Sequence, residues 1–197
     1  MKHSSKHFFK TLFLLVLPFS FFACIGGGTI EPSRYYTIST EPISVSKKTN
    51  TKESVFVKKF TIASAYKRNN IVYRESAYSF MFYDLDLWAS RPEDMITKTV
   101  KEYLKQSEVF TVFSKNATTK PTFEIFGNID AIEEIDEGSS RYARLSLQLT
   151  LQKTTGEIIT EKDFDEKLAL NGNTPEHVAE GISKLLAKYM ETFLQEF

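Results

Sequence analysis

LSLQLTLQ, residues 145–152, decides the fold, because a leucine alternates with a polar residue throughout it. Side chains of a β-strand point alternately to its two faces, so this pattern predicts a strand with one apolar face and one face in water. The Thr-Thr-Gly of residues 154–156 is typical of a turn, and residues 157–168 follow as a second strand. The two strands are therefore expected to form an antiparallel hairpin.

Shorter strands are predicted upstream of this hairpin. Apolar, aromatic and β-branched residues mark them at residues 34–40, 54–63, 71–73, 78–83, 109–113 and 123–129. Gly127, in the last of these, indicates a bulge or a close approach of other atoms. A sheet with one apolar face and one wet face is typically antiparallel and covered on one side only.

Two amphipathic helices are expected to provide that cover. The first begins at Ser90 and Glu93, which have capping-box spacing, and its apolar face comprises Ile96, Val100, Tyr103 and Leu104. The second has Thr174 as its N-cap and Pro175 as its first residue, and its apolar stripe comprises Val178, Ile182, Leu185, Leu186, Tyr189 and Phe193.

The fold class that follows is α+β. We expect a single domain over residues 34–197, with a largely antiparallel sheet and two main helices packed on one face. The alternative for the last helix is a position on a membrane surface, because Lys184 and Lys188 flank its apolar stripe.

The start of the chain has the pattern of a secretory signal. Residues 1–10 carry three lysines and no acid, residues 12–22 are apolar apart from Ser20, and Ala23 precedes Cys24. Residues 12–23 would span about 18 Å as a helix, whereas a hydrocarbon core is about 30 Å thick. We therefore expect residues 1–23 to be a cleaved signal peptide, rather than a membrane-spanning helix.

Cys24, the single cysteine of the chain, is expected to be the lipidated first residue of the mature protein. A diacylglycerol and an N-acyl chain on Cys24 would hold the protein in a membrane, and no other cofactor is expected. Residues 24–33, rich in glycine, are expected to be a flexible tether. The alternative is an ordinary signal peptide with a chance cysteine. Ile25, where an aspartate would favour the inner membrane, favours an outer-membrane anchor that faces the periplasm.

The composition of the mature chain excludes some functions. Three of the 25 Lys and Arg residues lie in the signal peptide and none of the 25 Asp and Glu residues does, so the net charge becomes −3. Such a balance gives no basic surface for nucleic acid. With one cysteine, no intramolecular disulfide can form, so the domain depends on its apolar core.

The residues of the mature chain do not favour an enzyme. His177 is the single histidine after Cys24, and it belongs to the first turn of the predicted last helix. Asp84, Asp86, Glu93 and Asp94 could imitate a Ca²⁺ site, but no metal is expected, because helix capping explains the last two. A second acidic run, comprising Glu133, Glu134, Asp136 and Glu137, is interpreted as a solvated hairpin tip.

Two stretches carry a resemblance to a known family. Two segments resemble the ABC-type transport auxiliary lipoprotein family: RYYTI at residues 34–38, soon after a predicted lipidated cysteine, and residues 70–113. The second segment opens with NIVYRESAYSFMFYDLDLW and continues through Pro92 and the first helix to Val109 and Phe110. The resemblance implies a non-catalytic subunit that docks a lipid transport assembly at a membrane. Its implied partners are a protein with an MCE (mammalian-cell-entry) domain, an ABC permease and an ATPase. A homo-oligomer is compatible with it.

Trp88 has two interpretations. It is either a core residue that fixes the preceding hairpin to the first helix, which we favour, or part of an exposed docking patch with Phe82 and Tyr83 for a protein partner or a lipid. Two other functions stay open beside the transport role. The chain could be an envelope-assembly lipoprotein that stabilises or plugs an outer-membrane barrel, or a lipoprotein hydrolase, which the histidine count disfavours.

Overall fold

The computed structural model describes residues 31–45, 53–113 and 120–197. One compact unit, Ser33–Phe197, contains every helix and strand described below. The predicted signal peptide, Cys24 and most of the predicted tether lie outside the described residues.

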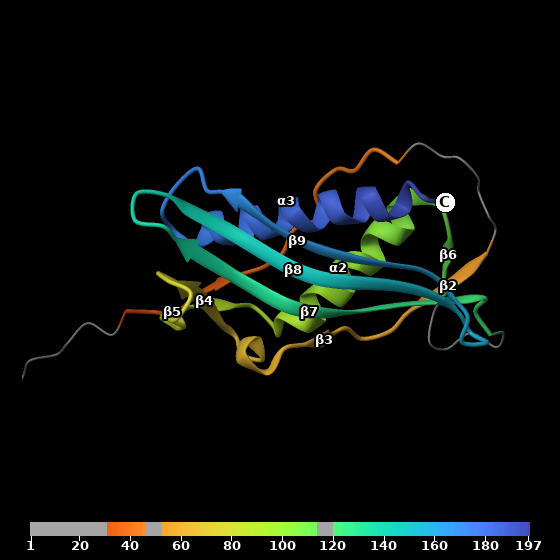
Figure 1. Ribbon diagram of the computed structural model, residues 1–197, viewed down its shortest axis with the longest axis horizontal. Coiled ribbons are helices and arrows are strands. Elements are labelled where there is room, and N and C mark those ends of the chain that lie inside the picture. Colours follow the sequence, from red (N-terminus) through yellow and green to blue (C-terminus); the bar gives the residue numbers. More distant parts are fainter. Residues whose placement is uncertain (1–30, 46–52, 114–119) are drawn as a thin grey trace, which may run out of the picture. The chain divides into compact units, whose positions relative to one another are not determined.

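Strand β7 (Phe123–Asp136) is the axis of a nine-stranded sheet. It pairs antiparallel with β8 (Arg141–Lys153), which pairs antiparallel with β9 (Ile158–Ala169). These three long strands form the sheet in the foreground of Figure 1. The predicted hairpin is therefore confirmed, and β9 has β8 as its one neighbour among the described strands.

The other edge of β7 carries short strands placed one after another along its length. These are β2 (Ser54–Val57), β3 (Thr61–Ile62) and β4 (Asn70–Arg74), all parallel to β7. Beyond them lie β6 (Thr111–Val112), parallel to β2, and β5 (Met81–Trp88), antiparallel to β4, with β1 (Arg34–Tyr36) parallel to β5. The expected α+β fold is confirmed, because the long pairings are antiparallel, while the short strands make the sheet mixed.

Both helices, α2 (Pro92–Ser107) and α3 (Pro175–Leu194), pack on the apolar face of this sheet, behind the strands in Figure 1. The four alternating leucines of β8 are buried there, as is the whole predicted stripe of α3. The Tyr189 hydroxyl donates a 2.7 Å hydrogen bond to the carbonyl of Leu145 and accepts one from the Glu166 amide. The last helix therefore covers the sheet rather than a membrane. No helix within residues 31–45, 53–113 and 120–197 is long and apolar enough to cross a bilayer.

The predicted capping box of the first helix is wrong. The N-cap of α2 is Arg91, with Pro92 as the first helical residue, so Ser90 lies one position too early to bind the helix amides. The side chain of Glu93 instead lies 3.5 Å from the Arg91 guanidinium. At α3 the predicted start is confirmed, with Thr174 as N-cap and Pro175 next.

Gly127 marks a close approach rather than a bulge. A Cβ at this position would lie 2.1 Å from the carbonyl oxygen of Gln148 and 2.5 Å from the ring of Phe60, so no larger residue fits without a shift. The bulge of β7 lies further along, between Ile129 and Ala131. After it, four consecutive residues of β7 are buried, because other elements cover both faces of the strand there.

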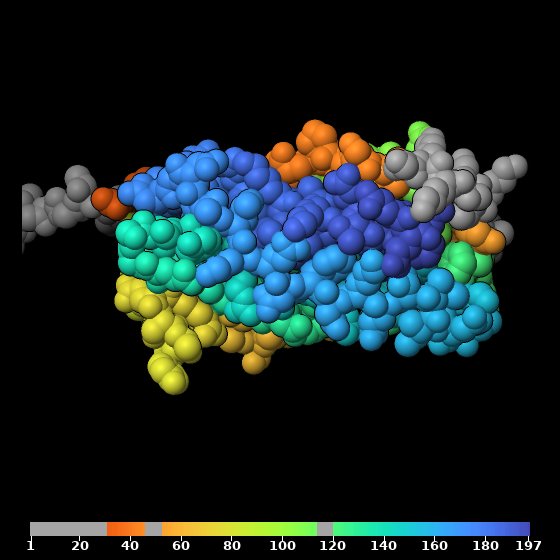
Figure 2. Space-filling view, turned by 45° about the horizontal axis from the view of Figure 1, so that its top comes forward, coloured from red at the N-terminus to blue at the C-terminus, as the bar shows by residue number. Residues whose placement is uncertain are grey.

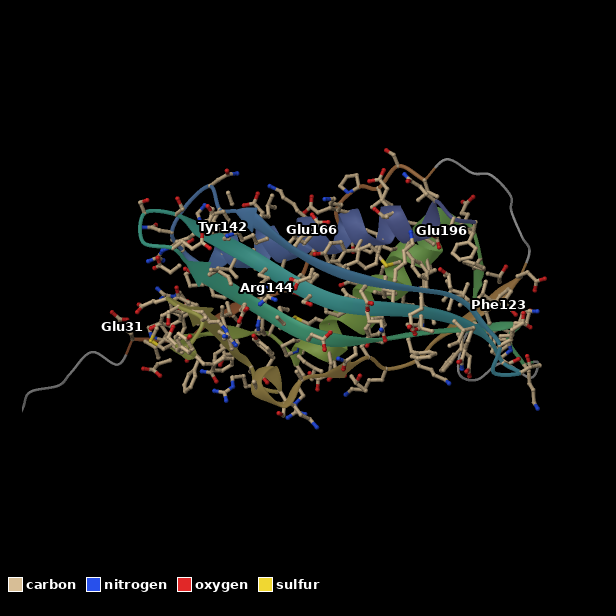
Figure 3. All side chains as sticks on the ribbon, viewed as in Figure 1. Glu31, Phe123, Tyr142, Arg144, Glu166 and Glu196 are labelled. Atoms are coloured by element: carbon tan, nitrogen blue, oxygen red, sulfur yellow. The ribbon has the colours of Figure 1, made fainter. Side chains whose placement is uncertain are left out.

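The domain has two distinct ends. At one, called here the Ser33 end, lie the loops of residues 75–80, 137–140 and 170–174 (Figure 1). Because β1 is parallel to β5, the chain before Arg34 runs toward this same end. The opposite end, called the Phe197 end, holds the turn of residues 154–157 and the last residue. Figure 3 labels Tyr142 near the first end and Phe123 near the second.

Candidate functional site

The three predicted docking residues all belong to β5 but do not share one surface. Trp88 is 1% exposed and lies in the core, so it is not available to a partner. Tyr83 is half-buried and its ring contacts that of Tyr73 at 4.9 Å. Phe82 is 43% exposed. Trp88 therefore has the core position that we favoured, and of the three it is Phe82 that offers substantial free surface.

Phe82 belongs to a surface cluster that the sequence does not reveal. The guanidinium carbon of Arg68 lies 4.6 Å from the centre of the Phe82 ring and 5.8 Å from that of Phe80. Arg74 lies 5.3 Å from the same Phe80 ring, and Tyr66 meets it edge to face. We call Arg68, Arg74, Phe80 and Phe82 the arginine–phenylalanine patch. Stacked cations and aromatic rings of this kind combine apolar area with positive charge.

A buried carboxylate fixes the base of this patch. Glu133 of β7 accepts hydrogen bonds from Arg74 Nε at 2.8 Å, from Arg144 Nη1 at 2.8 Å and from the Tyr66 hydroxyl at 2.5 Å. Tyr66 comes from η2 (Ser64–Tyr66), Arg74 from β4 and Arg144 from β8, so this carboxylate connects four elements. Burial, together with the bond to Glu133, raises the pKa of Tyr66 to about 12.

The next residue, Glu134, likewise connects β7 to other strands, but on the opposite face of β7. Glu134 accepts a 2.9 Å hydrogen bond from the Tyr83 hydroxyl and lies 3.2 Å from Arg141 Nη1. Burial raises the pKa of both Glu134 and Tyr83 above their ordinary values. The expected solvated tip is therefore wrong for Glu133 and Glu134, which are buried, while Glu137 is exposed and pairs with Lys167.

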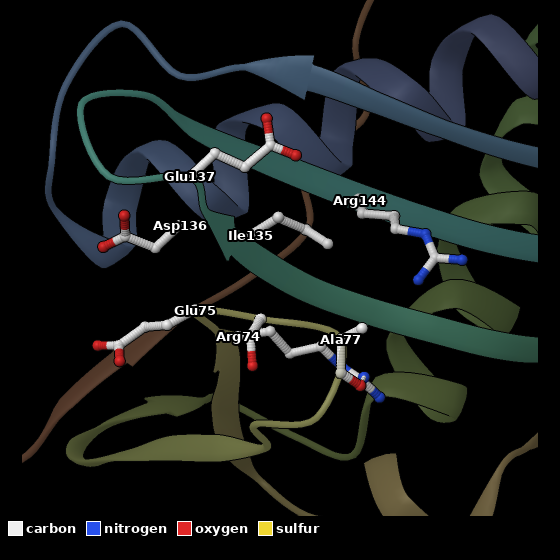
Figure 4. Close-up of a pocket in the computed structure, with 8 residues that line it drawn as sticks. Arg74, Glu75, Ala77, Ile135, Asp136, Glu137 and Arg144 are labelled. Carbon is white, nitrogen blue, oxygen red and sulfur yellow. Dashed lines mark hydrogen bonds between the residues drawn. The ribbon is translucent and has the colours of Figure 1, made fainter.

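A pocket of about 340 Å³ opens beside this network at the Ser33 end. Its lining comprises Arg74, Glu75, Ser76, Ala77, Ile135, Asp136, Glu137 and Arg144. In Figure 4 the carboxylates of Glu75 and Asp136 lie on one side and the two guanidinium groups on the other. Arg144 already binds Asp165 through Nε and Nη2, both at 2.9 Å, and Arg74 binds Glu133. The pocket therefore offers an anion little unpaired positive charge.

Three of the four acids that could imitate a Ca²⁺ site have cationic partners of their own, namely Asp86, Glu93 and Asp94. Asp86 accepts hydrogen bonds from Arg34 Nε at 2.7 Å, from Arg34 Nη2 at 2.9 Å and from the Tyr36 hydroxyl at 2.9 Å. Asp94 pairs with Lys59 at 2.6 Å. In the part of the chain that the structure describes, no three His, Cys, Asp or Glu side chains are grouped as a metal site requires. Arg34 and Tyr36 of the RYYTI stretch therefore serve to hold β1 against β5.

Comparison with known structures shows which proteins share this sheet and its helices. The protein XCC0632 from Xanthomonas campestris is similar with a TM-score of 0.74 and 14% identity, over 83% of this chain and 94% of that one. A second solved structure, of an uncharacterized protein, has a TM-score of 0.69 and 15% identity, over 84% of this chain and 99% of that one. The hypothetical protein CT253 from Chlamydia trachomatis follows with a TM-score of 0.52 and 9% identity, over 75% and 98%. These likenesses show a shared fold.

The chain therefore shares its α+β fold, a sheet covered by two helices, with these proteins. The model of one family, the ABC-type transport auxiliary lipoprotein component, matches residues 36–192. The chain belongs to this family, so the family predicted from residues 34–38 and 70–113 is confirmed. No curated protein matches the chain.

Proposed function

We propose that the protein is a non-catalytic lipoprotein subunit of an ABC-type lipid transport system, facing the periplasm, with an MCE-domain protein, a permease and an ATPase as partners. The observation that carries this proposal is the family match over residues 36–192, which takes in nearly all of the described domain. In this role the acyl chains on Cys24 anchor the protein in the outer membrane, as Ile25 favours.

The arginine–phenylalanine patch is the surface that we propose for docking the MCE-domain partner. Interface residues that dominate binding energy are enriched in aromatic residues and arginine, and a rigid support reduces the entropy lost on binding. Phe82 has that support, because the next residue, Tyr83, is bound to Glu134, and Arg68 donates a 3.1 Å hydrogen bond to the Ala65 carbonyl. The patch therefore offers an ordered ring and a cation on one face of the sheet.

A non-catalytic role agrees with the environment of His177. Its Nδ1 lies 2.7 Å from the hydroxyl of Thr174, the N-cap of α3, so the imidazole takes part in the start of a helix. A hydrolase needs a nucleophile activated by a base that is itself oriented by a third group. Among the residues that the structure describes, His177 is hydrogen-bonded to Thr174 and to no third group that would orient it, which makes the hydrolase the least supported function.

Co-purification tests the docking role. The full-length lipoprotein is purified from membranes with a tagged MCE-domain protein, in the wild type and in the variants Phe82→Ala and Arg68→Ala. If Phe82 is a residue that dominates binding, its loss costs about 2 kcal/mol, which corresponds to about a thirtyfold weaker complex. Ile158→Ala at the Phe197 end, where the isoleucine is 57% exposed, is the matched control and should bind as the wild type does.

Two results would count against this function. Wild-type protein that never captures the MCE-domain protein, even with crosslinking, argues against the transport role, and capture of an outer-membrane barrel supports the envelope-assembly alternative. Normal capture by Phe82→Ala would show that the partner docks elsewhere than on the arginine–phenylalanine patch. The lipid anchor is tested separately by palmitate labelling, which should be lost in Cys24→Ala.

A further inference from the structure

The loop between β4 and β5 presents a tyrosine that has no cover at all. Tyr78 is 100% exposed. A fully exposed aromatic ring leaves its apolar faces in contact with water, which is unfavourable unless something else covers them. Its position at the tip of a loop, rather than on a sheet or helix, makes it accessible to a flat surface.

The loop that holds Tyr78 is ordered by its own serines. The Ser79 hydroxyl accepts hydrogen bonds from the amides of Glu75 and Ser76, both at 2.9 Å. The Ser76 hydroxyl accepts in turn from the amides of Tyr78 at 3.2 Å and Ser79 at 3.1 Å. The backbone of residues 75–79 is thereby fixed, so the direction in which Tyr78 projects is set by the fold.

This loop projects from the Ser33 end of the domain. In Figure 2 the yellow segment, β4 with the loop and β5, forms a knob that stands out from the rest of the surface. The register agrees, because Arg74 of β4 pairs with Ile135 near the end of β7, and β7 turns into β8 just beyond it. The opposite end of the sheet, where Ile158 begins β9, is separated from this loop by the length of β7.

The length of chain before the domain determines which end stays near a membrane. Eight residues lie between Cys24 and Ser33, so the two residues are nine peptide steps apart and can be separated by at most about 32 Å. Strand β7, with 14 residues, is itself about 46 Å long. A lipid anchor on Cys24 therefore keeps the Ser33 end close to the bilayer, whereas the Phe197 end can lie well beyond the reach of the tether.

We propose that Tyr78 inserts into the interfacial layer of the bilayer that holds the lipid anchor, and so makes a second contact between the protein and the membrane. Tyrosine suits this layer, because its ring is apolar and its hydroxyl is polar. The contact would restrict the orientation of the domain relative to the bilayer. This inference rests on the proposed lipid anchor at Cys24.

Tryptophan fluorescence tests the contact. The chain contains a single tryptophan, Trp88, which is buried, so its emission supplies a constant background and reports that the domain is folded. The lipidated full-length protein with Tyr78→Trp is reconstituted into vesicles of phosphatidylethanolamine and phosphatidylglycerol, with or without brominated acyl chains. The introduced indole should shift to shorter wavelength in plain vesicles and lose most of its emission in brominated ones.

Ile158→Trp is the matched control, because it places an exposed indole at the Phe197 end, and it should show neither effect. Flotation of every sample with its vesicles separates the two proposals. A variant that floats but is quenched no more at position 78 than at position 158 overturns the membrane contact and leaves the anchor intact. A blue shift without quenching also overturns it, because the ring is then covered by protein. A protein that fails to float overturns the anchor, and the contact with it.

Discussion

The Tyr66 hydroxyl donates a 2.5 Å hydrogen bond to Oε2 of Glu133, the same oxygen that Arg74 binds at 2.8 Å. The phenol comes from a short 3-10 helix and the carboxylate from the central strand, 67 residues later. This contact holds the segment between β3 and β4 against the sheet, directly beneath the arginine–phenylalanine patch.

Removing the buried carboxylate should destabilise the domain strongly. In Glu133→Ala, Arg74 and Arg144 lose a buried anionic partner, and breaking a buried pair in this way costs about 3–5 kcal/mol. Glu137→Ala, which breaks an exposed pair with Lys167, should cost less than about 1 kcal/mol. Urea unfolding followed by Trp88 fluorescence measures both free energies. Equal losses in the two variants would contradict the role of Glu133 as the connecting group.

The raised pKa of Tyr66 predicts a loss of stability in alkali. Its pKa is about 12 in the folded protein and 10 in the unfolded chain, so its contribution is complete below pH 10 and is lost as the pH rises to 12. The free energy of unfolding of the wild type should therefore fall over this range. About 2 kcal/mol of this decrease in the free energy of unfolding should be absent in Tyr66→Phe, which has no hydroxyl to ionise. Identical pH profiles for the two proteins would show that Glu133 does not hold the neutral phenol.

Trp88→Ala should remove a large part of the stability of the core. Truncation of a buried tryptophan leaves a cavity and costs about 3–5 kcal/mol, so the thermal transition followed by circular dichroism should move to much lower temperature. Phe82→Ala, six positions earlier on the same strand, should change the transition little, because its ring is partly in water. An unchanged transition in Trp88→Ala, with loss of the partner, would instead favour Trp88 as a docking residue.

Asp86 should control the attachment of β1. Its hydrogen bonds with Arg34, and then with Tyr36, hold the pKa of Asp86 below its usual value despite burial. This contribution is present above the pKa of an unfolded aspartate and is lost as the pH falls through the lower folded value. Asp86→Asn should therefore speed hydrogen exchange at Ala89, whose amide binds the Tyr36 carbonyl, while leaving β8 protected. Asp84→Asn, at an exposed position of β5, is the control, and equal exchange in both variants would argue against this attachment.

Much of the fold could be predicted because its signals are local. The alternation of Leu145 to Leu151 and the stripe of α3 each lie within one element, and each defines a buried face without reference to the rest of the chain. The predicted N-cap of α2 is one residue too early. Either Ser90 or Arg91 could be the N-cap before the helix, and which of them is depends on the path of the preceding strand, β5.

The candidate site could not be predicted, because its contacts join distant parts of the sequence. Glu133 and Glu134 have the composition of a solvated turn, and they are buried because η2, β4 and β5 cover one end of β7. The pairing of Arg68 with Phe82 depends on the register of β4 and β5, which shifts between Asn70 and Val72. Glu133 lies opposite Arg144 on the neighbouring strand, and an acid paired in this way with an arginine is the one signal that could have indicated the buried network.

The free side of β9 has a consequence for how copies of the protein meet one another. Among the described strands β9 pairs with β8 alone, and on its other side the amide of Glu166 binds the Tyr189 hydroxyl rather than a strand, so this edge is one that a further strand could approach. The lipid anchor that we propose at Cys24 would place copies of the protein in one plane, where they would meet each other far more often than in solution. Lys162, Asp163, Asp165, Glu166 and Lys167 place charge along this edge. In an in-register stack of identical strands each of these charges would meet its own kind, so repulsion between like charges opposes such stacking along this edge.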